Sequence, residues 1–275
     1  MTLSARNDFF RGGIIFAALS LAFIAAGGYF AFPAYPEAAA AAAMRSRGMI
    51  QALIDREPSA YVPFYTMLAA GAYSFISIIL INYFFEKTHS PEILFFGLFV
   101  VSLSFEFVRV MVPLKTIVPF PAMYLITGSR ILLFGRYFGL FSLFAAAVYA
   151  AGLDAQKQQN TFLILVLSAL VIAIRVPIDS LVWDSTLVPW NGYKSMFSLV
   201  EAGILAVTIL TFFISAYTRG SRAYVFIGFG TFLVFIGRSI LINSDTWITP
   251  LPGLLALSMG TWLICSRLHR EYLWL

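Results

Sequence analysis

Ionisable side chains lie inside three of the long apolar segments of this chain. Glu106 and Arg109 are three residues apart in the first segment, and Arg175 and Asp179 are four apart in the second. Both spacings place two side chains on the same face of a helix. The third segment carries Arg238 without an acid beside it. Because a charge is costly inside a bilayer, such residues normally face a bundle interior or a wet cavity, and each is a functional candidate.

The positions of these residues along their segments predict that they share one layer of the membrane. A helix rises about 1.5 Å per residue, so Arg109, Arg175 and Arg238 each lie roughly 20–27 Å from the inner end of a span. The same reasoning places five more ionisable residues in the outer half of a hydrocarbon core about 30 Å thick. The complete set is Glu106, Arg109, Arg130, Arg136, Arg175, Asp179, Glu201 and Arg238.

Five of these eight residues are arginines and three are acids, which gives a net charge of +2 if all are ionised. A guanidinium group binds a carboxylate or a phosphate through two parallel hydrogen bonds. We therefore predict an outward-facing, arginine-rich pocket for an anionic or polar ligand. Arg109, Arg175 and Arg238 are the expected binding groups, and Arg130 and Arg136 join them from the next helix. The three acids of the set are expected to orient the arginines.

Two other interpretations of the buried charges remain open. The acids could pair with three of the arginines as ties between helices, without any ligand. Arginines in the outer half of the membrane could instead extend to lipid headgroups. A structure separates these interpretations, because pure ties leave no void beside the paired charges.

Residues typical of catalytic and metal sites are few in this sequence. The only histidines, His89 and His269, lie at predicted helix ends, which excludes a haem or HExxH zinc site inside the bundle. The single cysteine, Cys265, excludes an internal disulfide. GxSxG, P-loop and GxGxxG motifs are absent, and each candidate acid has an arginine nearby that opposes a role in proton transfer. We expect no enzyme activity, no catalytic residue, no metal and no cofactor.

The composition identifies the class of protein. The chain of 275 residues is 60% hydrophobic and 11% charged, whereas a soluble domain has about 25% charged residues. This composition is that of a polytopic membrane protein, with membrane lipids around it. The formal net charge of +5 does not indicate a nucleic-acid partner, because loop arginines in membrane proteins set the topology.

Eight apolar segments are long enough to span a bilayer, which takes about 20 residues. We predict an all-α fold, a polytopic membrane helix bundle with eight transmembrane helices and one short periplasmic helix. Residues 1–35 are expected to form a signal-anchor helix, 36–58 a periplasmic amphipathic helix, and 59–275 a seven-helix membrane bundle. The predicted spans are 13–32, 62–85, 91–112, 122–151, 161–183, 194–217, 222–242 and 248–266.

The distribution of basic residues predicts the orientation in the membrane. Arg6 and Arg11 precede the first span, and alternate short loops further along are richer in lysine and arginine than the others. Because basic loops stay in the cytoplasm, we predict a multi-pass protein of the bacterial inner (cytoplasmic) membrane with both termini cytoplasmic. The predicted pocket then opens toward the periplasm.

Three sequence patterns carry a family resemblance. They are Ala72-Tyr73-Ser74 through Asn82-Tyr83-Phe84, the inner turn Glu86–Pro91 followed by Phe95-Phe96, and the closing Arg267–Leu273. With them, the part from about residue 65 to 275 resembles the seven-helix domain of bacterial seven-transmembrane receptors with diverse intracellular signalling modules, the 7TMR-DISM class. The resemblance implies a receptor. That family usually has a sensor domain before the helices and an output domain after them, and we expect neither here.

The sequence therefore predicts a receptor-like inner-membrane protein that signals in trans. The expected partners are an anionic small molecule or a lipid headgroup at the pocket, and a membrane or cytoplasmic protein at the inner loops. One alternative is an accessory or scaffold subunit of a larger membrane complex, with the charges as internal ties. Another is a small-solute transporter or channel, which needs polar groups near the membrane midplane and beyond.

Overall fold

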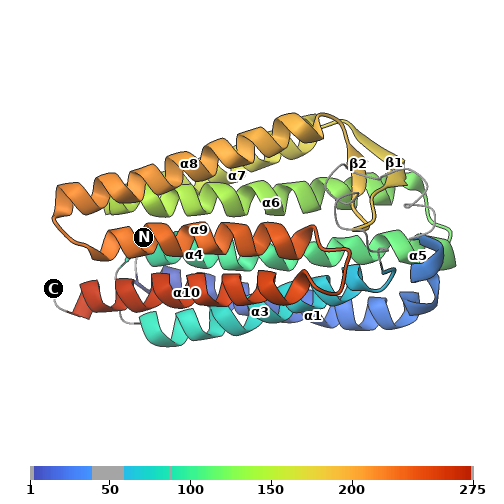
Figure 1. Cartoon of the computed structure of the whole chain (residues 1–275), viewed down its shortest axis with the longest axis horizontal. Helices are drawn as coiled ribbons and strands as arrows, with labels where there is room; N and C mark the ends of the chain where they lie inside the picture. Colours follow the sequence, from blue (N-terminus) through green and yellow to red (C-terminus); the bar gives the residue numbers. More distant parts are fainter. Residues whose placement is uncertain (1–2, 39–58, 87, 89, 274–275) are drawn as a thin grey trace.

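The protein is a bundle of long helices that lie side by side (Figure 1). The computed structural model describes residues 3–38, 59–86, 88 and 90–273. Eight of its helical segments are long and apolar enough to cross a bilayer. Helices suit this environment because they satisfy every backbone polar group within the segment. The all-α membrane bundle with eight spans that the sequence predicts is confirmed.

The described elements follow one another in chain order. The first part comprises α1 (Leu3–Ala31), η1 (Phe32–Ala34), α3 (Val62–Phe85), α4 (Pro91–Ser102), η2 (Leu103–Val110), α5 (Met111–Ile117) and α6 (Ala122–Ala150). The second part comprises η3 (Ala155–Lys157), α7 (Gln158–Arg175), β1 (Ile178–Trp183), β2 (Pro189–Asn191), α8 (Lys194–Arg219), α9 (Ala223–Ile242) and α10 (Pro250–Leu273). The η elements are 3-10 helices, and α4, η2 and α5 together form one continuous span.

Both ends of the chain lie at the same end of the bundle, and the hairpin β1–β2 lies at the opposite end (Figure 1). We call these the termini end and the hairpin end. An even number of spans requires this arrangement. The predicted placement of both termini on one side of the membrane agrees with the fold.

The predicted span 161–183 is wrong in its last third. Helix α7 ends at Arg175, and Ile178–Trp183 forms a strand that pairs antiparallel with β2. Pro177 is the physical reason, because proline disfavours helical geometry in the residue before it and lacks the N–H that a helix needs. Val176 accordingly adopts an extended conformation with ψ 125°. Asp179 therefore lies on a strand, and it does not share a helix face with Arg175.

Helix α1 is part of the bundle. It begins at Leu3 and packs against α3, α4 and η2, with the ring of Phe16 4.9 Å from that of Phe105. The predicted anchor at 1–35 is thus integrated with the helices that follow it. The predicted amphipathic helix at 36–58 lies outside the described residues, apart from its first three.

Helices α9 and α10 pack with their backbones in close contact. A Cβ atom on Gly237 would lie 2.5 Å from the backbone nitrogen of Leu257, and one on Gly260 would lie 2.6 Å from the carbonyl oxygen of Gly230. Small residues at such interfaces allow close approach in a membrane, where apolar burial alone does not drive helices together. The two helices therefore form a closely packed pair.

Helices α7 and α8 present the most lipid-like surface of the bundle. Few of their side chains are buried, and the exposed ones are large and apolar, such as Leu163 and Leu167 on α7 and Leu199 and Phe213 on α8. Lipid tails are the natural contact for this surface.

Candidate functional site

The segment η2 aligns the two charges that the sequence places three residues apart. In a 3-10 helix, with about three residues per turn, side chains i and i+3 eclipse one another. Arg109 Nη1 accordingly donates a hydrogen bond to Glu106 Oε2 at 3.2 Å. Both side chains are buried, with exposed fractions of 1% for Arg109 and 3% for Glu106. The pairing that the spacing indicates is therefore present inside the bundle.

Arg136 of α6 forms a second ion pair with Glu106. Its Nε and Nη2 donate to the two carboxylate oxygens at 2.8 and 3.0 Å, which is the bidentate geometry typical of this pair. Two glycines of α6 permit the approach, since a Cβ on Gly135 would overlap with the side chain of Phe105 and one on Gly139 would overlap with a side chain of α4. These glycines have the GxxxG spacing that favours close helix packing in membranes.

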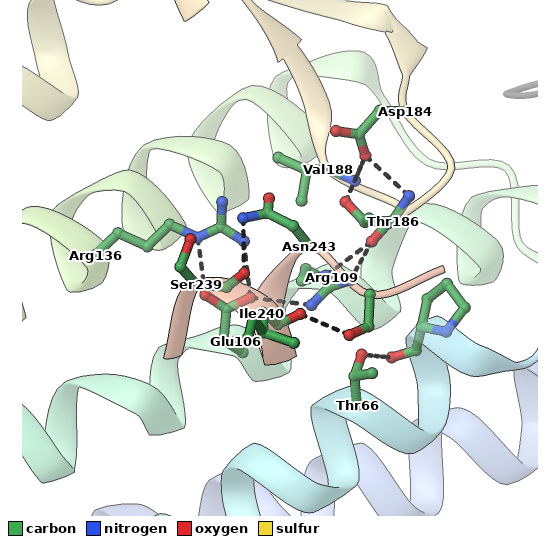
Figure 2. A network of polar contacts seen from close by, with 12 residues as sticks. Thr66, Glu106, Arg109, Arg136, Asp184, Thr186, Val188, Ser239, Ile240 and Asn243 are labelled. Atoms are coloured by element: carbon green, nitrogen blue, oxygen red, sulfur yellow. Dashed lines mark hydrogen bonds and ion pairs between the residues drawn. The ribbon is translucent and has the colours of Figure 1, made fainter. Parts of the chain in front are cut away.

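Arg109 also holds the loop of the hairpin, residues 184–188. Its Nε donates to the carbonyl oxygen of Thr186 at 2.9 Å, and its Nη2 donates to the same oxygen. Figure 2 shows Arg109 between Glu106 on one side and the hairpin loop on the other. One buried guanidinium thus ties the 3-10 segment of the third span to the hairpin.

Asp184 shapes this loop from within. Its Oδ1 accepts hydrogen bonds from the backbone N–H groups of Thr186 and Val188 at 3.0 and 3.1 Å, and from the hydroxyl of Thr186 at 2.6 Å. Leu187 has a φ of 60°, a conformation that costs a non-glycine residue roughly 1–2 kcal/mol, and its side chain is fully buried. The loop is therefore held in place by Asp184, Arg109 and a buried leucine.

A cavity of about 180 Å³ lies beside this network, between α6, α8, α9 and the hairpin. We call it the polar chamber. Its polar and charged lining comprises Arg136, Tyr137, Asp184, Ser198, Glu201, Arg238, Ser239 and Asn243, and its apolar lining comprises Leu133, Val188, Pro189, Phe197 and Ile242. Pure structural ties predict paired charges without a void, so the chamber favours the binding interpretation.

Arg238 and Glu201 reach the chamber from neighbouring helices. Arg238 of α9 is 3% exposed, and its one hydrogen bond among the described residues runs from Nη2 to the carbonyl oxygen of Arg136 at 3.2 Å. Glu201 of α8 interacts electrostatically with Arg136 and Arg238. Within the described part of the chain, however, Glu201 forms neither an ion pair nor a hydrogen bond.

The structure brings together five of the eight predicted site residues. Glu106, Arg109, Arg136, Glu201 and Arg238 lie in the charge network or line the polar chamber.

The other three predicted residues lie elsewhere. Arg130, Arg175 and Asp179 are exposed and do not line the chamber. Arg130 and Arg136 are six residues apart, which places them about 120° apart around an α-helix. Arg175 is the last residue of α7, and Asp179 is on β1.

The predicted charge surplus does not apply to the chamber. Across the chamber and the charge network beside it, Arg109, Arg136 and Arg238 contribute three positive charges, and Glu106, Glu201 and Asp184 contribute three negative charges. The formal sum is zero, whereas the eight residues predicted from the sequence sum to +2. The two missing positive charges are those of the exposed Arg130 and Arg175, and Asp184 replaces the exposed Asp179.

Sequence reasoning overlooked several residues that build the site. Asp184 is followed by Ser185-Thr186, and an aspartate at the start of such a polar turn is the usual signal of a side chain that caps its own loop. The Gly135 to Gly139 spacing was available as a signal of close packing beside Arg136. Ser239 and Asn243 extend the polar end of α9, where Asn243 Nδ2 donates to the carbonyl oxygen of Ser239 at 2.8 Å.

Metal-binding groups do not gather in the part of the chain that the structure describes. No cluster of three or more histidine, cysteine, aspartate or glutamate side chains is placed there to hold a metal ion. The chamber offers hydrogen-bond donors, acceptors and two incompletely paired charges. Groups of this kind can bind a polar solute non-covalently.

Comparison with known proteins found no protein-family model and no curated protein sequence that matches the chain.

Proposed function

We propose that this protein is a receptor-like membrane protein whose polar chamber binds a small polar solute, and whose termini end signals to a separate protein. The observation that carries the proposal is the chamber itself, a void lined by charges that are not fully paired. Sites for drug-sized ligands have volumes of about 300–1,000 Å³, so a volume of about 180 Å³ suits a smaller solute. In this proposal the hairpin end faces the periplasm, and the likeness to 7TMR-DISM receptors supports the signalling role.

Helix α9 offers a rigid connection from the chamber to the termini end. Arg238 lies in its second half, and at its other end Tyr224 accepts a hydrogen bond from Arg219 Nη1 at 2.7 Å. Because α9 packs closely on α10, a shift of α9 at the chamber carries α10 with it. The last turn of α10 contacts α4, where the Tyr272 hydroxyl donates to Glu92 Oε2 at 2.6 Å. Binding at one end would thus alter helix contacts at the other.

A second candidate function is that of an accessory or scaffold subunit of a larger membrane complex. It is favoured by a specific observation, namely that Arg109, Arg136 and Arg238 each have a carboxylate or carbonyl partner inside the bundle. In this case the charges are ties, and the chamber holds only water.

Native mass spectrometry of protein gently extracted from its own membrane tests the two functions. The receptor proposal expects a reproducibly bound small molecule that is lost in Arg238→Gln. The matched control is Arg130→Gln, which changes an exposed arginine of the neighbouring helix α6 and should leave the bound molecule in place. A stoichiometric protein partner without any small molecule would instead support the accessory subunit.

A further inference from the structure

Most of the charged side chains around the polar chamber already form hydrogen bonds within the protein. Both oxygens of Glu106 accept hydrogen bonds from arginines, two from Arg136 and one from Arg109. Nε and Nη2 of Arg109 donate to the carbonyl oxygen of Thr186. Asp184 satisfies the N–H groups of its own loop. These groups have little capacity left for a solute.

Arg238 and Glu201 have that capacity. A guanidinium group carries five N–H donors, and Arg238 uses Nη2 for one hydrogen bond to a described residue. The carboxylate of Glu201 can accept several hydrogen bonds, and it accepts none from the described residues. The two groups lie on different helices and line the same cavity. Arg136 also lines the chamber, but it has Glu106 as its ion-pair partner, whereas Arg238 and Glu201 form no ion pair within the described residues. The chamber therefore presents a cation and an anion without ion-pair partners to whatever occupies it.

We propose that the solute is a zwitterion with a primary ammonium group and a carboxylate or phosphate group, held by Glu201 and Arg238 respectively. This inference rests on the proposed function, since it requires that the chamber binds a solute. A simple anion would satisfy Arg238 but add a second negative charge beside the partly buried carboxylate of Glu201 and offer it no hydrogen-bond donor, and a simple amine would do the reverse. A charge that loses water on binding without gaining a partner is costly. A zwitterion satisfies both groups and adds no net charge to a chamber whose own charges sum to zero.

The remaining walls limit the rest of the solute. Leu133, Phe197 and Ile242 form an apolar part of the lining that suits a short hydrocarbon side chain. A water molecule occupies about 30 Å³ in the liquid, so the chamber corresponds to roughly six waters. Two sources have this chemistry and size, a small free amino acid and the phosphoethanolamine headgroup of a lipid.

Matched analogues test the proposal on the purified full-length chain. The probes are alanine with propionate and ethylamine, leucine with 4-methylpentanoate and 3-methylbutylamine, and glycerophosphoethanolamine. Isothermal titration measures the dissociation constant of each. We expect an amino acid or glycerophosphoethanolamine to bind at least tenfold more tightly than any probe that carries only one of the two charges. Tight binding of glycerophosphoethanolamine alone identifies a lipid headgroup, and tight binding of an amino acid identifies a free solute.

Two charge-removing variants assign the charges. Glu201→Gln should weaken the zwitterion, and it should bind the matching acid at least as tightly as the original protein does, because the carboxylate that disfavours the acid is gone. Arg238→Gln should weaken the zwitterion to the affinity of the matching amine. Arg130→Gln is the control and should leave every affinity unchanged. The comparison of analogues on the unmodified protein needs no variant, so it stays informative even if one of the variants does not fold.

The inference and the proposed function fail in different ways. The zwitterion is overturned if no zwitterionic probe binds more tightly than the probes with a single charge, or if no probe binds while native mass spectrometry still finds another solute. Either result leaves the receptor proposal standing. If no probe binds and native mass spectrometry finds no solute, both the zwitterion inference and the receptor proposal are contradicted. The accessory-subunit interpretation is then favoured.

Discussion

At the scale of single residues, Glu106 has the most demanding role in the buried network. It is one carboxylate between two guanidinium groups, and all three side chains are largely withdrawn from solvent. A buried charge is tolerated when its partners remain in place and becomes costly when one is removed. The network therefore depends on Glu106 more than on either arginine alone.

Replacing Glu106 with glutamine should destabilise the protein by on the order of 3–5 kcal/mol, because it leaves two buried arginines without their counter-charge. The measurement is the free energy of unfolding in mixed detergent micelles. The control is Asp8→Asn, which removes the surface pair between Asp8 and Arg11 at 3.9 Å. Exposed pairs contribute little, so the control should unfold like the original protein. Equal stability of the two variants would show that Glu106 is not a structural tie.

At the scale of elements, the hairpin loop is attached to the bundle through Arg109 and ordered internally by Asp184. These two roles can be separated by hydrogen exchange. Arg109→Ala should speed exchange of the backbone amides of 184–188 roughly tenfold or more, since hydrogen bonds to charged groups contribute about 1.5–3 kcal/mol. Arg130→Ala, an exposed arginine in the same half of the bundle, should leave them unchanged. Unaltered exchange in Arg109→Ala would mean that Leu187 and Asp184 hold the loop without it.

The close packing of α9 on α10 makes a prediction with an internal control. Gly237→Ala adds a methyl group 2.5 Å from a backbone atom of α10, so the helices must separate, and such overpacking costs about 1–3 kcal/mol. Gly203→Ala adds the same methyl group to α8 where nothing lies within 4 Å, and it should be neutral or slightly stabilising because alanine favours helix over glycine. The measurement is the melting temperature of each variant in detergent, which should be lower for Gly237→Ala than for Gly203→Ala. Similar values would contradict the tight α9–α10 interface.

At the scale of the whole molecule, the number of spans determines that the two termini share a side, and the basic loops predict which side that is. Substituted cysteines test the orientation in a background in which Cys265 is replaced by alanine. Val118→Cys lies between α5 and α6 at the hairpin end, and Gln156→Cys lies in η3 before α7. Both positions are exposed. A membrane-impermeant maleimide added to intact bacterial cells with a permeabilised outer membrane should label Val118→Cys at once and Gln156→Cys only after lysis. The opposite pattern would invert the predicted topology.

The sequence predicts the spans well and the site in part, for physical reasons that particular residues make clear. Continuous apolar runs identify helices because a bilayer allows little else. Pro177 is a recognisable helix-stop signal. The predicted span nevertheless continued past it, because most of the residues that follow are also apolar. The pairing of Glu106 with Arg109 follows from spacing, but its partner Arg136 depends on how closely α6 approaches, and that depends on Gly135 and Gly139. Asp184 lies in a loop, so the helical periodicity of the sequence could not predict that it belongs to the site.

The 3-10 winding of η2 has a mechanical consequence. A 3-10 helix rises about 2.0 Å per residue and an α-helix about 1.5 Å, so the eight residues of η2 make the third span about 4 Å longer than a regular helix would be. Rewinding η2 into an α-helix would shorten the span by that amount. It would also turn residues three apart by about 60° relative to one another, so Glu106 and Arg109 would no longer eclipse, although they would still share a helix face. The eclipsed ion pair therefore favours the longer form of the span.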